Sequence, residues 1–286
     1  MTHRSLHDIL HRPGPIIMGI LNVTPDSFSD GGDYLSIDVA VTHALKMAAD
    51  GAEIIDVGGE STRPPGAAYG VGAQTLSVTE ELERVIPVIK AIREKNQDVL
   101  ISVDTQKSEV AELAIEEGAD IINDVSAGTT DPAIFRTAAN RQAPIILMHG
   151  HGPHFQKPRI EDYEYDDVVF EVKRYLEERI QAARRAGVVT ILADVGIGFG
   201  KVYQDNLKLL KHHAEFESLR VPLVLGVSRK SSIGRAMGSN PPPKERVIGS
   251  IAAACYGVQH GAKIIRTHDV KPTREALAVL AAIEHS

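Results

Sequence analysis

A TIM (β/α)8 barrel is the fold class that this sequence predicts, and three observations support it. Eight short apolar runs, rich in β-branched residues, alternate with segments of helical periodicity along the 286 residues. Near-continuous apolar runs are typical of parallel strands that are buried on both faces of a sheet. The first run is not followed by the Gly-x-Gly-x-x-Gly turn of a dinucleotide-binding sheet. Eight strand-then-helix units therefore favour a closed barrel over the alternative, an open doubly wound sheet.

Each apolar run predicts one strand. In chain order the runs are PIIMGILNV (15–23), AEIIDVGG (52–59), VLISVDT (99–105), DIINDVS (120–126), PIILMHG (144–150), TILADVG (190–196), PLVLGVS (222–228) and AKIIRTHD (262–269).

Helices are predicted between these runs. The clearest is 165–186, where apolar residues recur every three or four positions and form one stripe. Ser77 and Glu80 have the spacing of a capping box at a helix start. Gly118 and Gly261 each stand where a helix ends before the next strand.

The bulk properties predict one cytoplasmic domain, 1–286, with the barrel proper at about 15–284. A net charge of -7 argues against nucleic acid or an anionic membrane as a general partner. The single cysteine, Cys255, excludes a disulfide framework and suits helix packing. The N-terminal MTHRSLHDIL lacks the apolar core of a signal peptide, and no run approaches the roughly 18 residues of a membrane span.

The predicted strands end in polar residues, which is the main functional signal. In a barrel the carboxyl ends of the strands converge on one face, where active sites lie. Burying so many polar groups there without a ligand would be costly. The residues are Asn22, Asp56, Asp104, Asn123, His149, Asp194, Ser228, Lys230, Arg266 and His268.

These polar residues fall into two chemical sets. The acidic and amide residues Asp56, Asp104, Asn123 and Asp194 suit a flat heterocycle with N–H donors and ring acceptors. The cationic set, Arg63, Lys230, Arg266 and His268, suits a phosphate or diphosphate, and Asn22 is a candidate oxygen ligand for Mg²⁺. A heterocycle beside a diphosphate suggests displacement of pyrophosphate by a nucleophile. Alternatively, Arg63 forms a surface ion pair and Lys230 caps its strand end.

Two stretches suggest other chemistry but fit it poorly. MHGHGPH contains His149, His151 and His154, yet its glycine spacing and lack of a matching carboxylate argue against zinc. His149 is predicted to be a rim or packing residue. DVGIGFGK (194–201) lacks the Gly-Lys-Ser/Thr of a Walker A loop, and its glycines suit close passage of the backbone beside a ligand. Lys201 is predicted to be solvated.

Seven stretches, in this order along nearly the whole chain, resemble dihydropteroate synthase. They are MGILNVTPDSFSDGG (18–32), GAEIIDVGGESTRP (51–64), ISVDTQK (101–107), IINDVSAG (121–128), GIGFGK (196–201), GVSRKSSIG (226–234) and IIRTHDV (264–270). The resemblance implies a TIM-barrel homodimer that is the target of sulfonamides, and the helix at 245–260 is a candidate dimer contact. It also implies the condensation of 6-hydroxymethyl-7,8-dihydropterin pyrophosphate with 4-aminobenzoate, which releases pyrophosphate and 7,8-dihydropteroate for folate synthesis.

The resemblance also implies a role for each matching residue. Asn22 would ligate Mg²⁺ at the diphosphate, and Arg63, Arg266 and His268 would hold that diphosphate. The pterin would be lined by Asp104, Asn123, Met148, Asp194 and Lys230. The aminobenzoate would lie beside Thr62 and Ser228, and the loop VTPDSFSDGG would close as a lid that brings Asp26 and Phe28 to it.

The mechanism that follows is dissociative. Mg²⁺, Arg63, Arg266 and His268 would stabilise the departing pyrophosphate, and Asp104 would stabilise the cationic pterin methylene before the aniline nitrogen attacks. Three features depart from the family pattern: Val195 in place of a proline, the stretch LMHGHGPHFQ, and a long second loop (61–78). The functional alternatives are a corrinoid-linked methyltetrahydrofolate methyltransferase and a non-catalytic pterin-binding paralogue.

Overall fold

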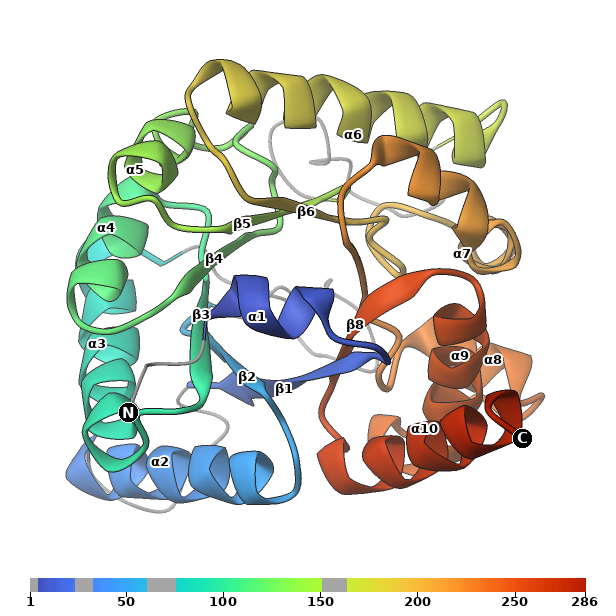
Figure 1. Cartoon of the computed structure of the whole chain (residues 1–286), viewed down its shortest axis with the longest axis horizontal. Helices are drawn as coiled ribbons and strands as arrows, with labels where there is room; N and C mark the ends of the chain where they lie inside the picture. Colours follow the sequence, from blue (N-terminus) through green and yellow to red (C-terminus); the bar gives the residue numbers. More distant parts are fainter. Residues whose placement is uncertain (1–4, 24–32, 61–75, 151–163) are drawn as a thin grey trace.

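Eight parallel strands close into a barrel, which confirms the predicted fold (Figure 1). The structure is a computed structural model and describes residues 5–23, 33–60, 76–150 and 164–286, with the backbone alone at 33–36. Each strand pairs with the next along the chain, and β8 pairs with β1. The strands are β1 (Ile16–Asn22), β2 (Ile54–Gly58), β3 (Leu100–Asp104), β4 (Ile121–Asp124), β5 (Ile145–Met148), β6 (Ile191–Asp194), β7 (Leu223–Leu225) and β8 (Ala262–Thr267).

Helices surround the barrel and connect its strands. Ser77 and Glu80 form the predicted capping box of α3, and the predicted stripe of α6 is buried at Val172, Leu176 and Ile180. The helices are α1 (Leu6–His11), α2 (Asp33–Ala49), α3 (Val78–Lys95), α4 (Ser108–Glu116), α5 (Ile134–Asn140), α6 (Val168–Arg185), α7 (Tyr203–Lys211), η4 (His213–Leu219), α8 (Ser231–Ala236), η5 (Pro243–Glu245), α9 (Val247–Gln259) and α10 (Val270–Glu284). No helix in the described part of the chain is long and apolar enough to cross a membrane.

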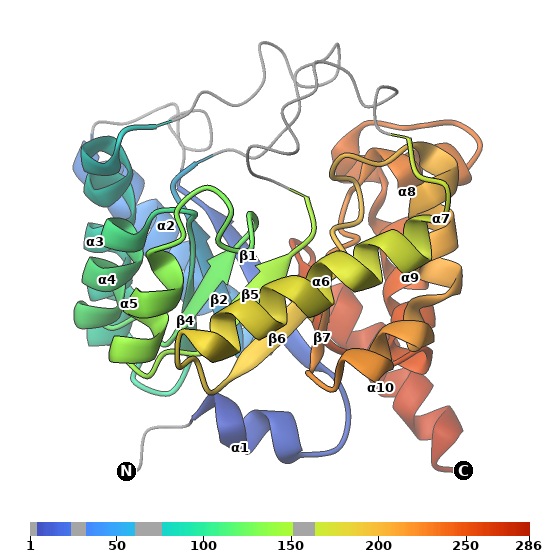
Figure 2. The same ribbon diagram turned by 90° about the horizontal axis from the view of Figure 1, so that it is seen from above.

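The short helix α1 closes the amino-terminal end of the barrel. Its side chains Leu6 and Ile9 are buried in the same apolar cluster as the inward-facing Ile16, Leu100 and Leu192. Figure 2 shows α1 lying across that end of the strands. A second, larger apolar cluster fills the layer between the strands and the outer helices. The amino-terminal end of the barrel is therefore closed by α1, and any ligand must enter from the carboxyl ends of the strands.

The barrel interior changes from apolar to polar toward those carboxyl ends. Met18 pairs with Ile54, and two residues further along Ile20 pairs with Asp56. In the same way Ile54 pairs with Leu100, and Asp56 with Ser102. Since side chains alternate between the two faces of a strand, Asp56 stands directly above the apolar layer and inside the barrel. The pairing register thus places a polar layer on an apolar floor.

Candidate active site

A narrow cavity opens within the polar layer at the carboxyl ends of the strands. Six of its lining residues were predicted from the sequence, and they come from six different strands or strand ends: Asp104, Asn123, Met148, Asp194, Lys230 and Arg266. The other four lining residues are Val125, Ile197, Phe199 and Gly226. The barrel thus brings residues that are far apart in the sequence around one space, as the convergence of strand ends requires.

Arg266 bridges two carboxylates at the base of the cavity. Its Nε lies 2.6 Å from Asp56 Oδ2, and its Nη2 lies 2.8 Å from Asp104 Oδ2. Asn123 donates from Nδ2 to the same Asp56 oxygen at 3.1 Å. The Asp56 side chain is fully buried. Buried charges require such partners, so Arg266 and Asn123 make the Asp56 carboxylate tolerable inside the barrel.

Asp104 has a proton affinity suited to a change of charge near neutral pH. Burial raises its pKa to about 7, against the opposing effect of Arg266, and the neighbouring Asp56 raises it further. Burial also raises the pKa of Asp194, whose Oδ1 accepts a hydrogen bond from the Gly196 N–H at 2.7 Å. These two carboxyl groups face the cavity from β3 and β6, where a bound heterocycle would meet them.

A left-handed turn directs Lys230 into the cavity. Arg229 has φ 58° and points away, forming a two-pronged ion pair with Asp269 at 3.0 and 2.6 Å. Its backbone N–H donates to Ser250 Oγ at 2.8 Å. Lys230 follows with its ammonium 4.0 Å from the centre of the Phe199 ring. Burial, with help from Arg266, lowers the pKa of Lys230 to about 8.

Ser228 orients His268 at the ends of β7 and β8. Its hydroxyl oxygen accepts the His268 backbone N–H at 3.1 Å and lies 3.0 Å from Nδ1 of the same residue. Because the serine oxygen also accepts from the Thr267 hydroxyl at 3.5 Å, both of its lone pairs are used and its own proton is placed to be donated to Nδ1. That arrangement favours the tautomer with a proton on Nε2, which then becomes a donor toward the rim.

The chemistry of the rim fits a magnesium ion held mainly by its substrate. Asn22 ends β1 half-buried and offers one amide oxygen. The described residues contain no group of three or more His, Cys, Asp or Glu side chains that could hold a metal ion. Mg²⁺ usually keeps several waters and binds through few protein oxygens together with substrate phosphates. A single amide ligand beside a diphosphate is consistent with that behaviour.

Four predicted site residues lie outside the described residues: Asp26, Phe28, Thr62 and Arg63. Residues 24–32 of the predicted lid (23–32), residues 151–156 of the stretch LMHGHGPHFQ and residues 61–75 of the long second loop (61–78) lie there too.

Other predictions have an outcome in the described part. His149 is a packing residue: it is buried, and its ring meets that of Tyr175 edge-on at 4.8 Å. Val195, which stands where the family has proline, packs in the outer apolar cluster rather than in the cavity.

The prediction that Lys201 is solvated is wrong. Its side chain is buried, with a residue exposure of 2 %, because three backbone carbonyl oxygens receive its ammonium. Sequence reasoning also missed Ile197 and Phe199, although both belong to the glycine-rich stretch that it singled out. The available signal was the sequence itself: two large apolar residues stand among glycines directly after a strand that ends in Asp194, where cavity-lining residues are expected.

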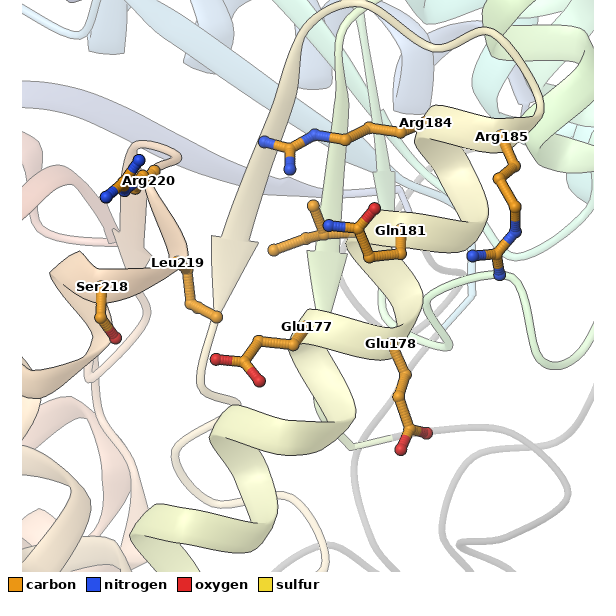
Figure 3. A pocket seen from close by; sticks show the side chains of 9 residues that line it. Glu177, Glu178, Gln181, Arg184, Arg185, Ser218, Leu219 and Arg220 are labelled. Carbon is orange, nitrogen blue, oxygen red and sulfur yellow. The ribbon is translucent and has the colours of Figure 1, made fainter.

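A larger hollow of about 590 Å³ lies elsewhere, between α6 and η4. Figure 3 shows Arg184 on α6 reaching over this hollow in the direction of Arg220. Arg184 belongs to the last turn of α6, and Arg220 lies three residues before the start of β7, so the hollow lies near the amino-terminal ends of the strands. It therefore belongs to the opposite end of the barrel from the polar rim.

Comparisons with known proteins agree on one family. The family described as "Pterin binding enzyme" matches residues 18–268. A dihydropteroate synthase of Streptococcus pyogenes serotype M6 is 47% identical over 269 residues, which are 93% of this chain and 95% of that one. The solved dihydropteroate synthase of Xanthomonas albilineans with 4-aminobenzoic acid is 44% identical, with a TM-score of 0.87 and coverage of 97% and 95%. A second structure of that enzyme, with 7,8-dihydropteroate, is 42% identical, with a TM-score of 0.83 and the same coverage.

Proposed function

Since the chain belongs to the dihydropteroate synthase family of pterin binding enzymes, we propose that the cavity on its barrel rim joins a dihydropterin pyrophosphate to 4-aminobenzoate. The observation that carries this proposal is the lining of the cavity: two carboxyl groups and an amide beside two cations, on an apolar floor. The products are 7,8-dihydropteroate and pyrophosphate, and the family's place is in folate synthesis.

The acidic and amide residues are assigned to the pterin. Asp104, Asn123 and Asp194 offer acceptors and a donor to the edge of a flat heterocycle, and Met148 supplies an apolar surface. Phe199 lines the same cavity, as does Lys230. The depth of this polar layer inside the barrel suits a planar ring that enters edge first.

The cationic residues are assigned to the diphosphate. Arg266 uses Nε and Nη2 for Asp56 and Asp104 among the described residues, which leaves Nη1 for a substrate oxygen. His268, oriented by Ser228, would donate from Nε2, and Arg63 is predicted to complete the clamp. Asn22 would hold Mg²⁺, which supplies charge neutralisation at the diphosphate when it is bound. Ser228 and Thr62, with Asp26 and Phe28, remain the predicted aminobenzoate contacts.

The reaction requires no nucleophile from the protein. The C–O bond between the pterin methylene and the diphosphate breaks, and its electron pair leaves with pyrophosphate, which Arg266 and His268 stabilise. The methylene is left cationic, and the Asp104 carboxylate is placed to stabilise it. The aniline nitrogen of 4-aminobenzoate then forms the new C–N bond and loses one proton.

The assay that tests this function follows pyrophosphate release from the pterin pyrophosphate, 4-aminobenzoate and Mg²⁺. We expect release that depends on both organic substrates, and formation of 7,8-dihydropteroate. Intact pterin binding without product would indicate the non-catalytic paralogue. Methyl transfer from methyltetrahydrofolate would indicate the corrinoid-linked methyltransferase, which has no use for a diphosphate clamp.

Two variants test the assigned roles. We expect Asp104→Asn and Arg266→Ala each to lower turnover by about a hundredfold or more, because both act on charge that develops in the transition state. Full turnover in Asp104→Asn, with none in Arg266→Ala, would show that the role given to Asp104 is wrong.

A further inference from the structure

Lys201 connects the ends of two neighbouring strands through its ammonium group. Its Nζ donates to the carbonyl oxygens of His149 at 3.0 Å, Gly196 at 2.9 Å and Phe199 at 2.8 Å. The first carbonyl directly follows β5, and the other two belong to the loop after β6. One buried side chain thus fixes the paths of both loops behind the cavity.

The number of acceptors matches the chemistry of an ammonium. Burial lowers the pKa of Lys201 to about 7, and no carboxylate forms an ion pair with it within the described ranges. An ammonium has three N–H donors and no acceptor, so three carbonyl oxygens use it fully. A neutral amine would turn its lone pair toward one of these oxygens. The loop geometry therefore suits a charged lysine.

The backbone of the loop passes close to its neighbours at two glycines, and at Gly196 it leaves no room for a side chain. A Cβ on Gly196, which has φ +69°, would lie 1.8 Å from the His149 carbonyl oxygen. A Cβ on Gly198 would lie 3.1 Å from Lys230 Cδ. The loop therefore packs against the end of β5 on one side and against the Lys230 side chain on the other. A movement of the loop after β6 would therefore also move the Lys230 side chain.

Phe199 is the residue through which the loop reaches the cavity. Its carbonyl is bound by Lys201, and its ring lies under the Lys230 ammonium at 4.0 Å from the ring centre. A cation over an aromatic face is held electrostatically, and more strongly where water is excluded. The position of the Lys230 charge thus depends on where the loop holds this ring.

We propose that Lys201 is a positioning residue of the pterin pocket. By gathering the carbonyls of His149, Gly196 and Phe199, it fixes the Phe199 ring beneath Lys230 and so sets where the Lys230 ammonium meets the pterin. The inference rests on the proposed function, because it takes the cavity lined by Phe199 and Lys230 to be the pterin site.

The first test is Lys201→Met, which keeps the apolar stem and removes all three donors. We expect KM for the pterin pyrophosphate to rise about tenfold and kcat to fall, since small misplacements of a binding group are costly. KM for 4-aminobenzoate should stay within about twofold of wild type, because its predicted contacts lie elsewhere on the rim. An unchanged pterin KM, or equal rises in both KM values, would overturn the proposal.

The second test is a double-mutant cycle with Phe199→Leu, which removes the ring and keeps an apolar side chain. If Lys201 acts through Phe199, Lys201→Met should cost much less kcat/KM in the Phe199→Leu background than in wild type. Full additivity of the two losses would contradict the proposed route.

Two control variants separate positioning from stability. Leu209→Ala on α7 opens a cavity in the outer core, where Leu209 is fully buried, and should lower Tm without changing the pterin KM. Lys208→Met removes an exposed lysine that pairs with Asp205 at 3.6 Å, and should change neither. If Leu209→Ala raises the pterin KM as Lys201→Met does, the effect belongs to stability and the proposal fails.

The activity of the wild-type chain separates the role of Lys201 from the proposed function. Absence of pyrophosphate release by the wild-type chain would count against the function alone. Pterin binding by calorimetry then still tests Lys201, with about tenfold weaker binding expected in Lys201→Met.

Discussion

Among the residues that line the cavity, Asp104 has a charge that is highly sensitive to pH near neutrality. Burial raises its pKa to about 7, whereas burial lowers that of the neighbouring Lys230 to about 8. The Asp104 carboxylate and the Lys230 ammonium are therefore both charged mainly between about pH 7 and about pH 8. Both charges lie on the cavity, so activity should report their titration.

We predict a bell-shaped pH profile for kcat/KM, rising through about pH 7 as Asp104 loses its proton and falling through about pH 8 as Lys230 loses its own. Asp104→Asn should abolish the rise in the remaining activity, and Lys230→Met should abolish the fall. Initial rates across pH 5.5 to 9.5, at about 0.5-unit steps, measure both limbs. A rising limb that persists unchanged in Asp104→Asn would assign it to another group.

The same titration has a consequence for stability with a definite sign. An unfolded aspartate has a pKa of about 3.8, so the folded protein holds the Asp104 proton more tightly than the unfolded chain does. Stability from this group is therefore fully present below about pH 4 and is lost as pH rises from there through about 7. In urea titrations, Asp104→Asn should gain stability relative to wild type between pH 5 and about 8. A relative loss over that range would contradict the assignment.

Sequence reasoning succeeded at single residues where position along a strand determines the environment. Asp104, Asn123 and Asp194 end apolar runs, and parallel pairing alone brings them together. It was wrong for Lys201, because a lysine at the start of a helix looks like a solvated residue. Its burial depends on carbonyls from two loops that no local pattern relates.

At the scale of elements, the strands were predictable and the helix α1 was not. An apolar run between turn residues identifies a buried strand locally, whereas a helix of six residues is too short for the spacing of Leu6 and Ile9 to identify it. The role of α1 depends on Leu6 and Ile9 meeting residues that follow much later in the chain. The N-terminal segment is thus part of the folded core although it precedes the first strand.

We predict that Ile9→Ala destabilises the protein by about 2 to 4 kcal/mol, the usual cost of truncating a buried isoleucine. Ile9 is only 1 % exposed, and its helix α1 lies at the end of the barrel opposite the rim (Figure 2). The midpoint of urea unfolding should fall while KM for both substrates stays at its wild-type value. His7→Ala, on the same helix, is the matched control and should leave the midpoint unchanged.

Two results would contradict this account of α1. An Ile9→Ala variant with wild-type stability would show that α1 does not seal the barrel. A raised KM at unchanged stability would link α1 to the rim instead.

At the scale of the whole molecule, the predicted homodimer has a candidate surface on α9 and α10. These helices pack beside each other and carry exposed apolar residues: Ile248 and Tyr256 on α9, and Val279 and Ile283 on α10. Several large apolar side chains on neighbouring helices are typical of a protein–protein contact. The sequence indicated the region 245–260 by its small, apolar residues, but which of them face outward depends on how α9 packs on the barrel.

We predict that the chain is a dimer and that Ile248→Asp shifts it to a monomer of 30.9 kDa, because a charge buried in an apolar contact is unfavourable. Ile248 is 79 % exposed, so the substitution should leave the fold of a monomer intact. Sedimentation equilibrium over a range of concentrations measures the mass. Val189→Asp makes the same kind of change at a position that is 92 % exposed and lies in the connection between α6 and β6, and should remain a dimer. A wild-type monomer would remove the dimer altogether, and a dimeric Ile248→Asp would place the contact on another surface.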